Sequence, residues 1–237
     1  AGLDERVTRV AHTFALAVEQ DVALTRTALE GLAMAPALSP PPDAALSAQD
    51  LAGLAWQAER VAAALDAVIA ITDLTGQEWL RTTAAPGEAS PQEAALAAAE
   101  RALATNAPTV SNLLLQDRTG QPRLAFFLPL RGEGGQPSAL LGATLRPARL
   151  RERMATHLVP PGAVIIVSDA AGWPVVEAGE PSGTLPPIVP WREGEPLAFS
   201  AEAADGAPWL LGFAAIPGLP GWSLTLAIPL DAHLAML

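Results

Sequence analysis

The sequence contains no cysteine, no lysine and no tyrosine, and these absences restrict its chemistry before any motif is considered. Without cysteine there is no disulfide, thiolate metal site or cysteine nucleophile. With all 14 basic residues being arginine and only three histidines present, most catalytic chemistries lack their side chains. The motifs GxSxG, HExxH and DxDxDG are also missing. We therefore expect no catalytic residues, no cofactor and no enzyme activity in this chain.

Positive charge is scarce: 14 basic residues face 25 acidic ones, giving a net charge of −11. This balance argues against a nucleic-acid partner and against attraction to anionic lipid. Hydrophobic residues make up 50% of the 237 residues, enough to bury a core in one large or two small domains.

An uncharged run from residue 206 to 230 is long enough for a membrane span. It is interrupted by prolines and glycines that would break a spanning helix. We expect two buried strands joined by a turn instead. No signal-peptide pattern is present, and because the chain begins at Ala1 without methionine we expect it to be a fragment.

Helical periodicity dominates the first third of the chain. Apolar residues at three- and four-residue steps predict a first helix of about 30 residues: Leu3, Val7, Val10, Phe14, Val18, Val22, Leu29 and Leu32. Ser47 to Asp50 resembles a capping box and opens a second helix, in which Trp56 is expected to pack. Ser90-Pro91 opens a third helix that ends near Asn106.

The remaining segments predict strands and hairpin turns. The expected strands are 67–72, 78–82, 109–116, 123–130 and 138–145, with turns at 73–76, 117–120 and 132–135, and a short arginine-rich helix from Pro147 to His157.

A repeat links the two halves of the chain. Residues 67–76 align with 163–172, residues 122–127 with 208–213, and residues 148–150 with 232–234. The offset shrinks along the chain, so the second copy lacks the helical insertion and has the proline-rich segment 181–196 in its place. Three collinear matches indicate two copies of one hairpin-plus-meander unit.

This pattern resembles the double Cache family, in which two PAS-like units follow one long helix. The segments that carry the resemblance are 67–76, 110–115, 123–131, 142–145 and 161–169. It implies an α+β fold: a long N-terminal helix (1–35), a membrane-distal PAS-like unit (36–150) and a smaller, reduced membrane-proximal unit (151–237). It also implies a periplasmic sensor domain of a bacterial chemoreceptor or histidine kinase, with membrane helices before Ala1 and after Leu237 and an outgoing helix beginning at 231–237. A homodimer through the N-terminal helix is a further expectation.

The family's pocket lies in the distal unit, and six residues are candidates for binding a small molecule there: Trp79, Arg81, Ser111, Asn112, Phe127 and Thr144. For each of them a purely structural role is the alternative. Ser111 or Asn112 could be a satisfied buried polar group, Thr144 a locally bonded strand residue, and Trp79 with Arg81 a surface pair. Of Phe126 and Phe127, one is expected in the core and the other on the pocket side.

Amino acids are disfavoured as the ligand. Amino-acid-binding members of the family carry a tyrosine-, arginine- and tryptophan-rich segment and an aspartate on the fifth strand. This chain has no tyrosine, and Thr144 stands at the aspartate position. A buried ammonium group requires a carboxylate partner.

A metal site is not expected, because His12, His157 and His233 are far apart. Three functions stay open: a ligand-sensing domain, a ligand-free dimerisation or partner-binding module, and an enzyme, the last weakened by the missing motifs.

Overall fold

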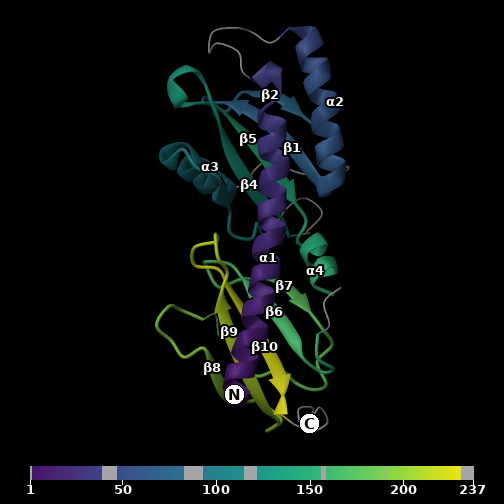
Figure 1. Ribbon diagram of the computed structural model, residues 1–237, viewed down its shortest axis with the longest axis vertical. Coiled ribbons are helices and arrows are strands. Elements are labelled where there is room, and N and C mark those ends of the chain that lie inside the picture. The colour runs from purple at the N-terminus through teal and green to yellow at the C-terminus, as the bar shows by residue number, and fades with distance from the viewer. Residues whose placement is uncertain are drawn as a thin grey trace. The chain divides into compact units, whose positions relative to one another are not determined.

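The computed structural model describes residues 2–38, 47–82, 93–114, 122–155, 159–189 and 191–230 (Figure 1). Its helices are α1 (Leu3–Ala33), α2 (Ala48–Leu65), α3 (Glu93–Thr105) and α4 (Pro147–Ala155), with short 3-10 turns at Pro36–Leu38 and Glu133–Gly135. Ten strands form two five-stranded antiparallel sheets. The α+β fold with a long first helix and two antiparallel sheets is therefore confirmed.

The chain divides into two compact units, each built on one sheet. The β1–β5 unit comprises Val22–Arg146, and the β6–β10 unit comprises Ala1–Asp21 with Pro147–Leu237. Helix α1 therefore contributes residues to both units. The predicted stripe is its buried face, with Val7, Phe14, Val18, Leu29 and Leu32 all in the core.

The ends of α2 and α3 form for local reasons. Ser47 is the N-cap of α2, because its Oγ accepts a hydrogen bond from the Asp50 amide at 3.1 Å. Asp66 ends α2 and Asn106 follows α3, each in the left-handed conformation that terminates a helix. The predicted capping residues Ser90 and Pro91 lie outside the described residues.

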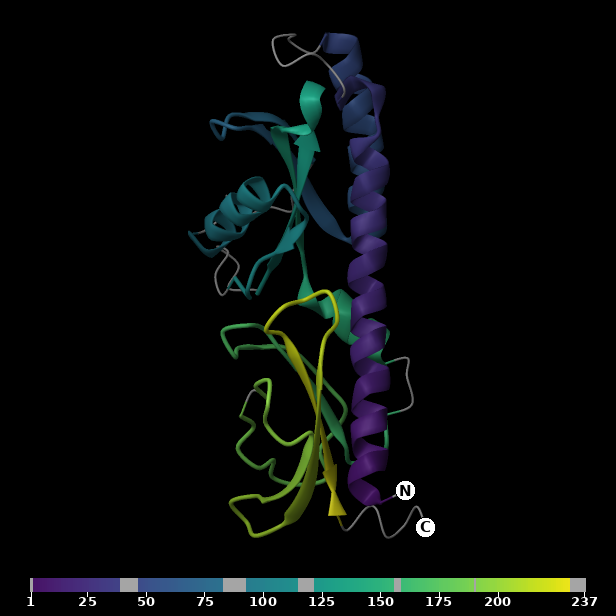
Figure 2. The same cartoon turned by 60° about the vertical axis from the view of Figure 1, so that its left-hand side comes forward.

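The β1–β5 sheet has the order β2-β1-β5-β4-β3. Its strands are β1 (Ala67–Asp73), β2 (Glu78–Arg81), β3 (Thr109–Val110), β4 (Leu124–Arg131) and β5 (Pro137–Leu145). One face packs on α1 and α2 through Leu29, Leu54, Ile69, Phe126 and Leu141. The other face packs on α3, which lies on the opposite side of this sheet (Figure 2).

The β6–β10 sheet repeats this topology in the order β7-β6-β10-β9-β8. Its strands are β6 (Val164–Ser168), β7 (Pro174–Ala178), β8 (Ala198–Glu202), β9 (Pro208–Ala215) and β10 (Ser223–Pro229). The uncharged run 206–230 thus forms β9 and β10, as predicted. Among the described residues, no helix is long and apolar enough to span a membrane.

The repeat extends to individual hydrogen bonds. Asp73 Oδ1 accepts from the amides of Thr75 and Gln77, and Asp169 Oδ1 accepts from those of Ala171 and Trp173. Both first hairpins carry a bulge, after Ile71 and after Val167, at the same distance before the aspartate. The described residues of 181–196 contain no helix, in agreement with the predicted loss of the helical insertion.

Two expectations about single elements were wrong. The strand predicted at 109–116 ends at Val110, because the Ser111 hydroxyl accepts the Ala125 amide at 2.9 Å in place of a backbone carbonyl. Pairing resumes only at an isolated bridge between Leu114 and Arg123. Trp56 is 61% exposed instead of packed in the core, and the Arg60 guanidinium lies 4.8 Å from its ring centroid.

Candidate functional site

One transverse row of residues crosses the α3-facing side of the β1–β5 sheet. Thr109 lies opposite Phe127, Phe127 opposite Gly142, Gly142 opposite Ala70, and Ala70 opposite Arg81. Directly paired residues of antiparallel strands point to the same face. The row therefore brings together residues from all five strands, and we call it the central row.

The middle of the central row is lined by small residues. Ala70 and Gly142, on the two inner strands β1 and β5, are only half-buried, and so is Thr144 in the adjacent row. A Cβ placed on Gly142 would lie 3.1 Å from the Phe127 ring, so the ring leans over this glycine. The inner strands of a sheet are normally the most covered, so the exposure marks this part of the face as accessible.

Phe127 is the member of the central row that packs against α3. It packs with Ala95, Ala98 and Ala102 of α3, whereas its neighbour Phe126 points into the α1/α2 core. The two phenylalanines thus point to opposite faces of the sheet, as expected, each into a buried cluster, and the pocket role of Phe127 stays a prediction. Because the buried residues of α3 are alanines, the helix backbone approaches the sheet closely beside Phe127.

The C-terminal end of α3 is fixed to the β4–β5 hairpin. Asn106 donates from Nδ2 to the Gly135 carbonyl at 3.0 Å. Arg131 donates from Nη2 to the Asn106 carbonyl at 3.1 Å and from Nε to its Oδ1 at 3.3 Å. These bonds hold one end of the helix that borders the candidate site.

Trp79 and Arg81 lie at the β2 edge of the same face, on either side of buried Leu80. Trp79 is 37% exposed. Arg81 is engaged by Glu78, whose Oε2 accepts from Nε at 2.9 Å and from Nη2 at 2.6 Å. The guanidinium therefore carries a partner carboxylate that a ligand would have to displace or share.

Ser111 is fully buried, and its hydroxyl is used by the backbone. It accepts from the Ala125 amide and donates to the Asn112 carbonyl at 2.7 Å. The hydroxyl proton of Ser111 is thus not free for a ligand. Asn112 follows the end of β3 and is half-buried.

Thr109 is a member of the central row that sequence reasoning did not single out. Its Oγ1 is buried and has no hydrogen-bond partner among the described residues. A buried polar atom without a partner is uncommon in native proteins. Nothing in the sequence marks this threonine, because its face depends on pairing with Phe127 across the strand.

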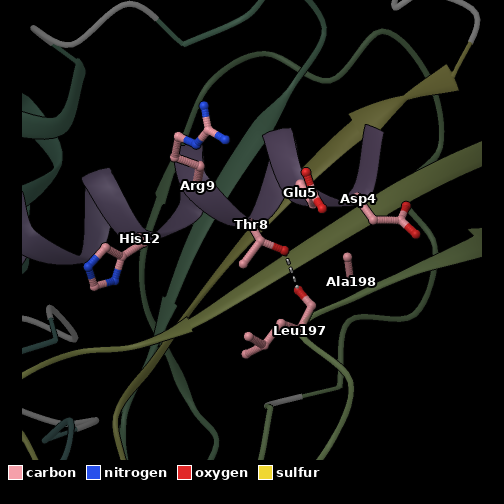
Figure 3. Close-up of a pocket in the computed structure, with 7 residues that line it drawn as sticks. All are labelled: Asp4, Glu5, Thr8, Arg9, His12, Leu197 and Ala198. Atoms are coloured by element: carbon pink, nitrogen blue, oxygen red, sulfur yellow. Dashed lines mark hydrogen bonds between the residues drawn. The ribbon is translucent and has the colours of Figure 1, made fainter. Parts of the chain in front are cut away.

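A separate groove lies in the β6–β10 unit, between the first turns of α1 and the start of β8 (Figure 3). Its volume is about 520 Å³, and it is lined by Asp4, Glu5, Thr8, Arg9, His12, Leu197 and Ala198. Thr8 Oγ1 donates to the Leu197 carbonyl at 3.4 Å. Charged side chains of both signs flank the groove, with no buried polar group aimed into it among the lining residues.

Metal-binding geometry is not present in the described part of the chain, where no three or more His, Asp or Glu residues come together. His12 lies in the groove just described, while His157 and His233 lie outside the described residues.

Solved structures with the same arrangement cover nearly the whole chain. The ligand-binding domain of the Pseudomonas fluorescens chemoreceptor CtaA, in complex with L-isoleucine, aligns with a TM-score of 0.71 over 99% of this chain and 95% of its own, at 17% identity. The chain has the double Cache fold. The ligand-binding domain of the Pseudomonas aeruginosa PAO1 amino acid chemoreceptor PctB, in complex with L-Arg, aligns at 0.70 over 99% and 90%, with 16% identity.

The double Cache fold is also shared by the extracellular domain of rpHK1S-Z16, a protein assigned as a histidine kinase. It aligns at a TM-score of 0.69 over 98% of this chain and 97% of its own, at 15% identity. No protein-family model matches the sequence, and no curated protein matches it. The fold is therefore recognised through structure, with identities too low to carry over individual residues.

Proposed function

We propose that this double Cache chain is the extracytoplasmic signal-sensing domain of a transmembrane receptor. It binds a small molecule on the α3-facing side of the β1–β5 sheet and transmits the signal to a cytoplasmic output domain. The observation that carries the proposal is the near-complete alignment with ligand-binding domains of chemoreceptors. The half-buried residues Ala70 and Gly142 of the central row support placing the site on this face.

The ligand of this site is proposed to lack an ammonium group. The similar chemoreceptor domains are complexes with L-isoleucine, L-Arg and GABA. Among the described residues of the α3-facing side, the carboxylate is that of Glu78, and it is already bonded to Arg81. A buried ammonium would compete with Arg81 for that one partner. Phe127, Thr109 and Thr144 suit instead a small molecule with an apolar part and hydrogen-bonding oxygens.

Transmission would use α1. Leu29 and Leu32 of this helix lie in the core on the other face of the same sheet, with Phe126 and Leu141. A ligand that binds one arrangement of the sheet more tightly shifts the population toward it. Because α1 is one continuous helix from Leu3 to Ala33, a displacement of its C-terminal part would be passed along the helix to its first turn.

A thermal-shift screen of the purified chain against small metabolites tests the proposal. The panel contains L-isoleucine, L-arginine and γ-aminobutyrate beside matched compounds without the amino group. We expect a compound of the second group to raise the melting temperature. Its affinity should fall at least about ten-fold in Gly142→Ala, since the new methyl occupies the open middle of the central row and crowds the Phe127 ring, 3.1 Å away.

The matched control is Gly53→Ala on α2, where an added Cβ meets nothing within 4 Å. This variant should bind like the parent chain. The proposal fails if no compound shifts the melting temperature, or if Gly142→Ala binds as tightly as the control. Tight binding of the amino acids alone would overturn the proposed ligand class and leave the site in place.

A second candidate function, a dimerisation module, is favoured by the exposure of Leu16 (43%) and Leu24 (45%) on α1. Sedimentation of the chain and of Leu16→Glu would distinguish the two functions. A ligand-independent dimer that the substitution dissociates supports this second candidate, whereas a monomer contradicts it.

A further inference from the structure

Strand β8 is an outer strand of the β6–β10 sheet, and one of its edges faces no other strand of the described residues. The register fixes which residues face that edge. The Leu197 carbonyl accepts from the Phe213 amide at 2.8 Å, and the Ala203 amide donates to the Ala207 carbonyl at 2.9 Å. Residues of an antiparallel strand alternate between bonding to the partner strand and facing away from it. The residues whose N–H and C=O groups face the free edge, here called the edge residues, are therefore Ala198, Ser200 and Glu202.

The other three outer strands are protected against further pairing. Natural sheets block their edges with short strands, charged residues, proline or a covering helix. Strand β3 has only two residues, β2 carries Glu78 and Arg81, and β7 begins with Pro174 and contacts α4. The first four residues of β8 are uncharged and none of them is proline. In the part of the chain that the structure describes, the edge of β8 is therefore the one left open to pairing.

The groove of Figure 3 lies beside this edge, with the start of β8 on one side and the first turns of α1 on the other. Ala198 pairs with Gly212, and a Cβ on Gly212 would lie 2.8 Å from Val7 of α1. Ala198 therefore faces α1, and the side chains of Ser200 and Glu202 share its side of the sheet. A strand added to β8 would place every second side chain on this side, towards the groove.

The α1 side of β8 is acidic. Asp4 and Glu5 lie in the first turn of α1 and line the groove, and Glu202 adds a third carboxylate on the same side of the sheet. Figure 3 shows the Arg9 guanidinium turned away from the start of β8, and His12 at the end of the groove opposite Asp4. A strand with arginine or lysine on this side is therefore complementary in charge. The net charge of −11 would also attract it.

The opposite side of β8 carries an exposed aromatic ring. Phe199 is 43% exposed although it stacks on Phe213, with ring centroids 5.3 Å apart. It pairs with Leu211, so it lies on the side away from α1. An added strand would cover the exposed part of this ring with its alternate side chains, and burial of the ring favours apolar residues there.

We propose that the free edge of β8 binds an extended segment of a partner protein by strand addition, and that this segment alternates arginine or lysine with apolar residues. Its backbone N–H and C=O groups pair with those of the edge residues. Its basic side chains lie towards Asp4, Glu5 and Glu202, and its apolar side chains cover Phe199. An extended polypeptide is the matching occupant, because the unpaired groups recur at every second residue along the strand. This surface is separate from the central row and does not depend on small-molecule binding there.

Fluorescence anisotropy with labelled peptides and the 237-residue chain tests the proposal. The basic peptide is TVRVRVT with blocked ends. Its controls are TVEVEVT, which reverses the charge, and TVRVRVT with N-methyl groups on both arginine amides, which then cannot donate to β8. We expect saturable binding of the basic peptide and at least about ten-fold weaker binding of either control. Affinity for the basic peptide should also fall between about 50 and 300 mM sodium chloride.

Ser200→Pro removes one edge N–H and leaves the bonds between β8 and β9 in place. Proline is tolerated on the outer edge of a sheet, and a melting curve followed by circular dichroism checks the fold. We expect at least about ten-fold weaker binding of the basic peptide. The matched control Ser200→Ala keeps the N–H and should bind like the parent chain.

The charge of the groove is tested without altering β8. The double variant Asp4→Asn, Glu5→Gln should bind the basic peptide more weakly and with less dependence on salt. The control Glu100→Gln removes an exposed carboxylate from α3 in the other unit and should leave binding unchanged. This pair of variants keeps the proposal testable even if Ser200→Pro fails to fold.

Four outcomes overturn the proposal. In the first, the basic peptide shows no saturable binding. In the second, its N-methylated form binds equally well. In the third, a folded Ser200→Pro binds as tightly as Ser200→Ala. In the fourth, sedimentation of the chain alone shows a dimer that Ser200→Pro dissociates, which would mean that β8 pairs with a second copy of this chain. None of these outcomes bears on the thermal-shift screen of the β1–β5 unit, so failure there is distinguishable from failure here.

Discussion

At the scale of single residues, Asp73 and Asp169 show how one side chain fixes a hairpin. Each carboxylate accepts two backbone N–H groups of the turn that follows it, at 2.8 to 2.9 Å. The sequence predicts this role, because Asx turns depend only on neighbouring residues. At Asp73 the Thr75 hydroxyl adds a further bond, which with the turn amides holds the pKa of the carboxyl below its ordinary value of 3.8.

The lowered pKa of Asp73 gives a pH prediction for Asp73→Asn. The native state binds the proton less readily than the unfolded state, so the ionised carboxylate stabilises the fold. This stabilisation is complete above about pH 5 and is lost as the pH falls below 3.8 through the lower folded pKa. In urea titrations the free energy of unfolding of the parent chain should exceed that of the variant by a constant amount from pH 6 to 8. This difference should shrink below about pH 4. A difference unchanged down to pH 3 would contradict the proposed role.

The roles of Ser111 and Thr109 do not follow from their neighbours in the sequence. Sequence alternation predicts that one residue of the Ser111–Asn112 pair faces inward, and Ser111 does. Its hydroxyl nevertheless replaces a backbone acceptor for Ala125, which ends the strand. Thr109 becomes a candidate binding residue only because it pairs with Phe127. Such roles depend on the partner strand.

At the scale of elements, the contact between α1 and β9 depends on a glycine. The backbone of α1 at Val7 approaches Gly212 so closely that a Cβ would lie 2.8 Å from Val7 Cγ2 and 3.1 Å from the Val7 carbonyl carbon. The helical stripe predicts that Val7 is buried. It does not predict which strand residue it meets, because that depends on how the sheet packs against the helix.

Gly212→Ala therefore should destabilise the β6–β10 unit by about 1–3 kcal/mol, the usual result of forcing an extra methyl into a packed core. Gly53→Ala, at an open position within α2, should instead stabilise the chain by about 0.5–1 kcal/mol through helix propensity. Chemical denaturation of both variants measures the two effects. Equal changes of the same sign in both would show that helix and strand are not in tight contact at Gly212.

At the scale of the whole molecule, two units with one topology share a single first helix. Residues up to Asp21 belong to the β6–β10 unit and those from Val22 to the β1–β5 unit. Phe14 is buried in the first of these stretches, and Leu29 in the second. A substitution in α1 should therefore act mainly on the unit to which its residue belongs.

We predict that Phe14→Ala destabilises the β6–β10 unit by about 3–5 kcal/mol and Leu29→Ala the β1–β5 unit by about 2–5 kcal/mol. Hydrogen exchange followed by mass spectrometry resolves the two effects. Peptides from β6 to β10 should exchange faster in Phe14→Ala, and those from β1 to β5 in Leu29→Ala. Uniform acceleration across the chain in both variants would show that the units unfold as one.

The sequence by itself determined the elements and their repetition. Helical periodicity, caps and turn residues depend on residues close together in the chain. The long helix, the two Asp-containing hairpins and the repeated meander can therefore be predicted from the sequence. The lack of tyrosine is also one basis of our proposal that the ligand has no ammonium group. Tertiary structure decided which distant residues lie together in the central row. The register that aligns Arg81, Ala70, Gly142, Phe127 and Thr109 is set by strand pairing and bulges. Tertiary structure also decided that the hydroxyls of Thr225 and Ser223 are buried with no hydrogen-bond partner among the described residues, because burial depends on what the rest of the chain packs over them.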